Sequence, residues 1–249
     1  MQEVISAINN AHVKAVRSLK DKKTRALLHK YVIEGVNIVK DIPSFVEFDL
    51  YYREDRETEA SAIIPRANNV YRVTDKVMNA MSETVNPSGL LAVATVSDNV
   101  FKGSDKVIYL DGISDPGNMG TIIRTAVALG VEDIIAVNSV DVYSSKVVRS
   151  SMGGIFNTNV VQMDENEALD VIRDYKVYTL DMNGDNIFDK SFTIDNSRFV
   201  LAVGNEAHGI GTKMKERADR VLSLPMTEKI ESLNAAVSLS TALYRIMYL

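Results

Sequence analysis

The sequence predicts an α/β protein whose C-terminal part forms a mostly parallel sheet with helices on both faces. From residue 106 onward, apolar runs of strand length alternate with segments of helical periodicity, which is typical of strand–helix–strand units. Residues 90–96, LLAVATV, form a continuous apolar run rich in β-branched residues, which indicates a buried strand. The chain has 249 residues, 46% of them hydrophobic, so it can bury one large core or two modest ones.

The first third is predicted to form a smaller α/β unit. Its apolar residues Val4, Ile5, Ile8, Val13, Val16 and Leu19 recur at roughly helical spacing, which predicts an opening amphipathic helix. Further elements are expected, in chain order: a strand ending at Gly35, a helix through Val36 and Val39, strands at 45–50, 61–65 and 69–73, and a helix capped by Asp75.

The remaining two thirds are predicted to supply the parallel sheet. Expected strands are 106–112, 133–138, 175–183, 198–206 and 220–225. Expected helices are 118–130, closed by Gly130, then 144–154, 212–219 and 232–247. The polar segment SDNVFKGSD separates the two parts. We therefore predict one domain at 1–98, a linker at 99–105 and a second domain at 106–249.

The composition excludes several classes of protein. The chain has no cysteine and three scattered histidines, His12, His29 and His208, so neither disulfides nor a metal site are expected. No run approaches the roughly 18 apolar residues of a membrane span, and the N-terminus lacks the pattern of a secretory signal. We expect a cytoplasmic protein that neither crosses nor binds a membrane.

A basic segment near the N-terminus is the charge feature that points to a partner. The net charge is −5, which by itself gives no reason to expect a nucleic acid. A basic cluster within an acidic protein can still bind phosphates, and a solvated helix end is the simpler alternative. The candidates for RNA contact here are Lys14, Lys20, Lys22, Lys23 and Arg25.

Three loops follow predicted strands at the sheet edge where open α/β folds bind ligands. The first, LDGISDPGNMGTIIRTA, carries Asn118 as an expected helix N-cap and, six positions on, Arg124. The second, VLAVGNEAHGIG, is rich in glycine and carries Asn205 and Glu206. The third, LSLPMTEKIESLNAAVS, places Ser232 as the expected cap of the last helix. Taken one at a time, each loop is also explained as a well-made turn or cap.

In this order, NMGTIIRTA, VGNEAHGI and LPMTEKIESLNAAVS resemble the three motifs of the SpoU-type (TrmH-like) branch of the SPOUT RNA methyltransferases. The resemblance covers the whole C-terminal domain at several fixed positions in each motif. The first third, through RALLHKYVIEGVNIVKD and SETVNPSGLLAVATV, is similar to the substrate-binding domain that precedes many members. That domain resembles RNA-binding ribosomal proteins of mixed α/β fold.

The resemblance implies a homodimer with a C-terminal trefoil knot that binds S-adenosylmethionine, without a metal, and methylates a ribose 2′-hydroxyl in structured RNA. Ribosomal RNA of the 23S type is the implied substrate. The implied cofactor contacts are Leu180, Gly204, Asn205, Leu224, Met226, Ser232 and Leu233. The implied catalytic and substrate-placing residues are Asn118, Arg124, Glu206, Ser232 and Asn234, with Arg124 also contacting RNA.

Two departures and three alternatives accompany this interpretation. Glu228 stands where the third motif often has glycine, and Arg245 stands where the last helix often has glutamate. A non-catalytic RNA-binding protein and a transfer-RNA methyltransferase are the main alternatives. An ordinary dinucleotide-binding enzyme is the third, but DGISDPGNMG lacks the glycine spacing that it requires.

Overall fold

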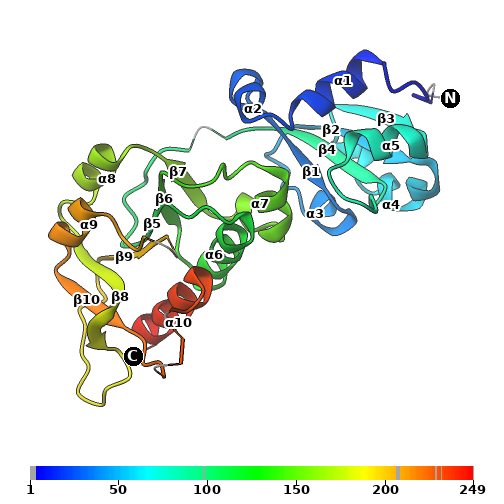
Figure 1. The fold of residues 1–249 in the computed structure, drawn as a ribbon. Helices are drawn as coiled ribbons and strands as arrows, with labels where there is room; N and C mark the ends of the chain where they lie inside the picture. The colour runs from blue at the N-terminus through cyan, green and yellow to red at the C-terminus, as the bar shows by residue number, and fades with distance from the viewer. Residues whose placement is uncertain (1–3, 98, 206–207, 228, 231, 249) are drawn as a thin grey trace. The chain divides into compact units, whose positions relative to one another are not determined.

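A computed structural model describes residues 4–97, 99–205, 208–227, 229–230 and 232–248. The chain forms two compact units (Figure 1). The first comprises Met1–Asp98 and Tyr143–Phe156, and the second comprises Asn99–Val142 and Asn157–Leu249. The first unit thus includes residues 143–156, which the sequence places in the second domain.

The first unit is built on a mixed four-stranded sheet of order β1-β4-β2-β3. Neighbouring strands are antiparallel except for β2 and β3, which are parallel. The strands are β1 (Lys30–Glu34), β2 (Phe48–Arg53), β3 (Asn69–Val73) and β4 (Leu90–Thr95). All but the last residue of β4 are buried, as its continuous apolar run predicts.

Helices cover this sheet, and α1 and α5 pack on one face around Val16, Val77 and Met78. The helices are α1 (Ala11–Ser18), α2 (Lys22–Leu28), α3 (Val36–Lys40), α4 (Glu57–Ser61), α5 (Asp75–Met81) and α7 (Ser145–Ser150). Short 3-10 turns are η1 (Glu54–Arg56), η2 (Ile64–Arg66) and η3 (Gly154–Phe156).

The segment 143–156 belongs to this unit through specific contacts. The ring of Tyr143 lies 4.8 Å from that of Tyr31, measured between centroids. The guanidinium of Arg149 lies 3.8 Å from the carboxylate of Glu34, which is 3% exposed. Ser145 donates a hydrogen bond to the carboxylate of Glu83. A helix from the later part of the chain therefore completes the first unit.

Three expectations for the first unit are wrong. The opening helix begins at Ala11 because Asn10 caps it, and residues around Ile5 instead lie beside β3. Residues 61–65 are not a strand, since α4 ends at Ser61 and η2 follows. A segment of five residues is too short for its periodicity to distinguish a strand from a helix. Thr74, one residue before Asp75, holds the N-cap position of α5.

The second unit is built on a six-stranded sheet of order β10-β8-β9-β5-β6-β7, in which every pairing is parallel. This confirms the predicted α/β class. The strands are β5 (Lys106–Asp111), β6 (Asp133–Val137), β7 (Asn159–Gln162), β8 (Lys176–Asn186), β9 (Phe199–Gly204) and β10 (Arg220–Ser223).

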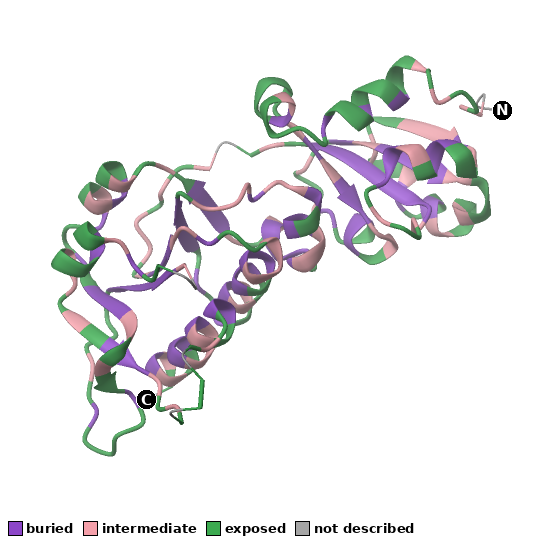
Figure 2. Cartoon of the chain, viewed as in Figure 1, coloured by how far each residue is buried: buried purple, intermediate pink, exposed green. Residues whose placement is uncertain are grey.

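Helices lie on both faces of this sheet. The helices are α6 (Pro116–Ala128), α8 (Glu165–Val171), α9 (Thr212–Arg217) and α10 (Ala235–Met247). Side chains of α8 and α9, such as Ala168 and Met214, pack with Val107 and Tyr109 of β5. Helices α6 and α10 lie side by side, joined by a 3.0 Å hydrogen bond between the hydroxyls of Thr125 and Ser240 (Figure 1). The central strands are buried (Figure 2).

A buried carboxylate attaches residues 102–104 to this sheet. Asp133 is fully buried and accepts hydrogen bonds from Asn159 Nδ2 at 2.6 Å and from Ser104 Oγ at 2.7 Å. Burial by itself would raise the pKa of Asp133. The hydrogen bonds from Asn159, Ser104 and Lys102 outweigh burial and hold that pKa below its usual value. Within the described ranges, no helix combines the length and apolar character needed to span a membrane.

Candidate active site

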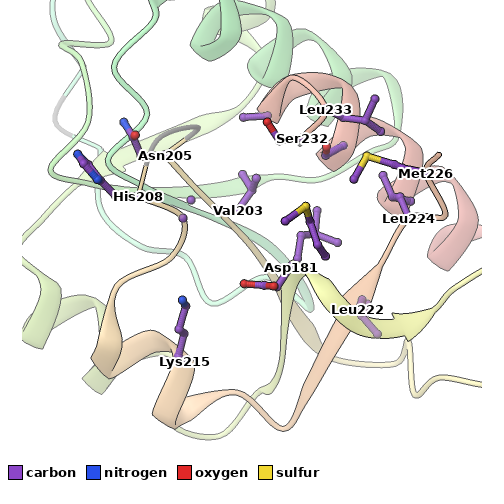
Figure 3. Close-up of a pocket in the computed structure, with 16 residues that line it drawn as sticks. Asp181, Val203, Asn205, His208, Lys215, Leu222, Leu224, Met226, Ser232 and Leu233 are labelled. Carbon is purple, nitrogen blue, oxygen red and sulfur yellow. The ribbon is translucent and has the colours of Figure 1, made fainter. Parts of the chain in front are cut away.

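The ends of β8, β9 and β10 and the start of α10 enclose a cavity of about 380 Å³ (Figure 3). It lies at the carboxyl edge of the parallel sheet, where ligands of open α/β folds bind. The residues that the resemblance implies as cofactor contacts all line it: Leu180, Gly204, Asn205, Leu224, Met226, Ser232 and Leu233. Residues as far apart in the chain as Leu180 and Leu233 thus form one site.

A bulge in β8 supplies one wall of this cavity. Thr179 pairs with Val221 and Asp185 pairs with Leu222, so the five residues between Thr179 and Asp185 have no partner in the ladder. Three of them, Leu180, Asp181 and Met182, line the cavity. Gly184 closes the bulge, and a Cβ there would lie 2.6–2.7 Å from backbone atoms of β10. The sequence predicts this strand but not the bulge.

The loop after β9 turns back on itself at a second glycine. Asn205 and Gly209 exchange backbone hydrogen bonds of 3.1 and 2.8 Å. A Cβ on Gly204 would lie 2.2 Å from the carbonyl carbon and oxygen of Gly209. The side chain of Asn205 donates to the carbonyl of Gly112 at 2.8 Å, which ties the loop to the end of β5. Glu206, implied as catalytic, lies outside the described residues.

The third loop is capped differently from the prediction. Asn234, not Ser232, is the N-cap of α10, and its Oδ1 accepts hydrogen bonds from the backbone of Ala236 at 3.0 Å and Val237 at 3.2 Å. The helix begins late because an asparagine side chain spans its first free amides. Ser232 is left in the loop before it, where it lines the cavity.

The first and third loops meet through their asparagines. Asn234 Nδ2 donates to Asn118 Oδ1 at 2.8 Å, which joins residues 116 positions apart. The sequence predicts Asn118 as the N-cap of α6, and this prediction is wrong. Asp115 takes that position and accepts from the Asn118 backbone at 2.8 Å, because Pro116 starts the helix two residues earlier.

Of the implied catalytic residues that the structure describes, Ser232 lines the cavity, whereas Asn118, Arg124 and Asn234 do not. Arg124 lies on α6, exposed, and makes no hydrogen bond or ion pair with any described residue. Six positions on a helix turn a side chain about 120° away from Asn118 and move it about 9 Å along the axis. Arg124 therefore does not share the side of α6 that carries Asn118, and neither residue lines the cavity.

The basic segment of the first unit divides into two groups. Lys14, Lys20, Lys22 and Lys23 are all exposed, and we call Lys14, Lys22 and Lys23 the basic surface. Lys20 Nζ donates to the carbonyl of Ser82 at 2.9 Å. Arg25 is 8% exposed, and its guanidinium donates to the carbonyls of Leu19 and Lys20. Arg25 therefore supports the turn before α2 and does not belong to the exposed group.

The cavity suits an amphiphilic nucleoside. Leu222, Leu224, Met226 and Leu233 form an apolar side, and Asn205, His208, Lys215 and Asp181 form a polar side (Figure 3). The polar residues His208, Lys215 and Asp181 were not predicted, because only the fold brings α9 and the bulge together. In the described ranges no three His, Asp or Glu side chains are grouped to hold a metal. The residues present fit S-adenosylmethionine, whose adenine ring has two apolar faces and whose amino-acid end is charged.

The two departures from the motifs have different outcomes. Arg245 packs within its own chain, since its Nε donates to the carbonyl of Ile187 at 3.0 Å and its guanidinium lies 5.9 Å from the ring of Phe192. Glu228 lies outside the described residues.

Known proteins resemble the chain along its whole length. The family model described as the SpoU rRNA methylase family matches residues 105–244, and that of the MRM3-like substrate binding domain matches residues 10–92. The chain is 28% identical to the 23S rRNA (guanosine(2553)-2′-O)-methyltransferase RlmP of Bacillus subtilis, with 99% of each chain covered. It is 30% identical to the 23S rRNA (adenosine(1067)-2′-O)-methyltransferase of Streptomyces azureus, covering 96% of this chain and 95% of that one.

A solved structure extends this similarity to three dimensions. The AdoMet-bound rRNA methyltransferase from Sinorhizobium meliloti matches with a TM-score of 0.85 and 25% sequence identity. The match covers 98% of this chain and 97% of that one.

Proposed function

This chain belongs to the SpoU rRNA methylase family, and we propose that it methylates a ribose 2′-hydroxyl of ribosomal RNA of the 23S type. It is an RNA 2′-O-methyltransferase, and S-adenosylmethionine is its methyl donor. The observation that carries the proposal is the convergence of the seven implied cofactor contacts on one cavity, with the Asn118–Asn234 hydrogen bond joining the flanking motifs.

The residues of the cavity have separate tasks in this proposal. Leu224, Met226 and Leu233 remove the apolar part of the cofactor from water, and the tight turn at Gly204 lets backbone approach it closely. Bound S-adenosylmethionine supplies an electrophilic methyl carbon. The protein's contribution is then to align the ribose hydroxyl, and alignment alone can lower a barrier by several kcal/mol. We assign that alignment to Asn118, Ser232 and Asn234.

Arg124 is assigned to the RNA rather than to the cofactor. A guanidinium stays protonated, so its natural tasks are to bind the adjacent phosphate and to stabilise negative charge developing on the ribose oxygen. Because Arg124 does not line the cavity of its own chain, a second copy or the bound RNA must complete this part of the site. Glu206 is proposed to hold the loop or the arginine.

The remaining parts of the proposal concern assembly and location. Val237 and Tyr244 of α10 and Tyr248 at its C-cap are exposed and recur at helical spacing, so they share one face. A second copy would cover them, in keeping with the proposed homodimer. The trefoil knot and the cytoplasmic location stay predictions. RNA is the partner, and we place its phosphate contacts on the basic surface of Lys14, Lys22 and Lys23.

Calorimetric titration with S-adenosylhomocysteine tests the cofactor site. Saturable binding is expected for the wild type and for Leu27→Arg, which makes the same chemical change at an exposed position of the first unit. Binding is expected to be lost in Leu233→Arg, because a guanidinium would occupy the apolar side of the cavity.

Transfer of a radiolabelled methyl group to fragments of 23S ribosomal RNA then tests the activity. The product should resist alkaline cleavage at one position, because a methylated 2′-oxygen cannot attack the phosphate. Methylation of transfer RNA but not of ribosomal RNA would contradict the proposed substrate. If the folded protein does not bind S-adenosylhomocysteine, with or without RNA, the alternative of a non-catalytic RNA-binding protein is favoured.

A further inference from the structure

The polar side of the cavity carries a positive and a negative side chain. Lys215 comes from α9 and Asp181 from the bulge in β8, so the two enter from different elements. Figure 3 shows the amino nitrogen of Lys215 directed into the cavity, with the carboxylate of Asp181 on the same side. The leucines and Met226 lie opposite them. No ion pair links Lys215 to Asp181 or to any other described residue.

The neighbouring cations of α9 make the position of Lys215 distinctive. Lys213 Nζ lies 3.1 Å from the carboxylate of Glu165 and donates to Asn166 at 2.7 Å. Arg217 lies 3.1 Å from the carboxylate of Asp219. Both are paired on the surface of the second unit, and neither lines the cavity. Lys215 combines a place in the cavity with a charge that no described side chain neutralises.

Asp181 is also available to a ligand. Its Oδ1 accepts one hydrogen bond, from the backbone of Asn183 at 3.2 Å, which holds the carboxylate in the bulge. A carboxylate offers about four acceptor sites, so this hydrogen bond leaves most of the acceptor capacity of Asp181 unused. A fixed carboxylate and an unpaired ammonium that share one side of a cavity are complementary to a zwitterion.

We propose that Lys215 and Asp181 recognise the amino-acid end of S-adenosylmethionine, Lys215 its α-carboxylate and Asp181 its α-ammonium. This inference rests on the proposed function. The α-carboxylate is the one anionic group of the cofactor, and ammonium–carboxylate hydrogen bonds are among the strong ones. The adenosine then takes the apolar side. The pair makes the cavity selective for the amino-acid-bearing cofactor over other adenosine compounds.

Binding of S-adenosylmethionine and of its decarboxylated form, measured by calorimetry, separates the role of Lys215 from a general effect. The wild type should bind the decarboxylated form roughly ten- to a hundredfold more weakly, as expected for loss of one charge-assisted hydrogen bond. Lys215→Met should weaken S-adenosylmethionine by a similar factor and leave the decarboxylated form unchanged. Lys215→Arg should retain most of the discrimination. Asp181→Asn should weaken both ligands, since both keep the ammonium.

Lys213→Met is the matched control, because it removes the same charge two positions away and outside the cavity. It should change neither affinity. The inference is overturned if Lys215→Met weakens both ligands equally or neither of them. A wild-type protein that binds neither ligand refutes the proposed function instead, so the two failures are distinct. Thermal unfolding of each variant reports whether it is folded.

Discussion

The predicted cofactor contacts of the second unit and the predicted basic residues of the first unit have opposite outcomes in the structure. The seven cavity residues are scattered from Leu180 to Leu233, yet the fold collects every one of them. The five basic residues lie within a dozen positions, yet Lys20 and Arg25 are engaged by backbone carbonyls. Motif residues at the ends of parallel strands are gathered by the topology. Residues that are neighbours in the sequence of a short helix point in different directions around its axis. The positive charge of a side chain therefore does not by itself tell whether that side chain is exposed.

Gly204→Ala should break the cavity and have the largest effect. The new Cβ would lie 2.2 Å from backbone atoms of Gly209, so the loop after β9 must move. We expect a loss of about 3 kcal/mol in the free energy of unfolding and loss of S-adenosylhomocysteine binding, measured by denaturation and calorimetry. Gly130→Ala is the control. Gly130 has φ +69° and nothing within 4 Å of its Cβ position, so we expect about 1 kcal/mol and intact binding. Equal effects of the two would remove the special role of Gly204.

Two substitutions of Asn234 should separate its cap from its link to Asn118. Asn234→Ala removes both, and is expected to cost about 1 kcal/mol of stability and to slow methyl transfer roughly tenfold or more. Asn234→Ser retains an oxygen for the cap but has no amide to donate, so stability should return while methyl transfer stays slow. Thermal unfolding and single-turnover methylation measure the two effects. Full recovery of activity in Asn234→Ser would show that the cap alone matters.

The basic surface should yield smaller and additive effects. Lys22→Gln and Lys23→Gln are each expected to weaken RNA binding a few-fold and to lower the salt slope of log affinity by about one. Arg25→Gln should instead destabilise the fold by about 2 kcal/mol and leave the slope unchanged, because its guanidinium is bound to carbonyls. Filter binding over a range of salt concentrations measures the slopes. If Arg25→Gln lowers the salt slope of log affinity, Arg25 contacts RNA phosphates after all.

The smallest of these effects is expected from acid, which should weaken the attachment of residues 102–104 to the sheet. The pKa of Asp133 is lower in the folded protein than in the unfolded chain. Its contribution to stability is therefore complete above about pH 4, the unfolded value, and is lost as the pH falls through the folded pKa. Asp133→Asn should lower the melting temperature at pH 7 and reduce the further decrease below pH 4. Glu132→Gln, at an exposed neighbour, should resemble the wild type. If the melting temperature of Asp133→Asn falls below pH 4 as much as that of the wild type, other carboxylates cause the loss of stability in acid.

The sequence predicts the sheet of the second unit well, because strands such as 106–112 and 198–206 are continuous apolar runs. It misses β7 and α8, which are short and carry weak periodicity. It also shifts helix starts, since Asp115 and Asn234 each compete with another good capping residue nearby. In such cases the loop geometry, and not propensity, selects the cap.

At the site, the motifs identify the residues at strand ends but not those delivered by the fold alone. Lys215 and Asp181 stand in ordinary polar segments, and nothing local distinguishes Lys215 from Lys213. The bulge that carries Asp181 depends on Gly184 lying against the backbone of β10, which is a long-range contact. The direction of Arg124 away from Asn118 follows from helical periodicity, so it could have been worked out from the spacing of these two residues.

The contribution of residues 143–156 to the first unit bears on how this protein can be cut. A catalytic fragment starting after residue 98 would keep α7 without its partners, uncovering Val147 and Val148, which are fully buried in the whole chain. A fragment ending at residue 98 would lose the guanidinium of Arg149 beside Glu34, a carboxylate that is 3% exposed in the whole chain, and would keep the hydrogen bonds from Ser82 and Thr84. Cutting the chain at residue 98 therefore does not give two fragments that each keep all the contacts of one unit. Evolution could exchange this substrate-binding unit between enzymes only by changing the β6–β7 connection along with it.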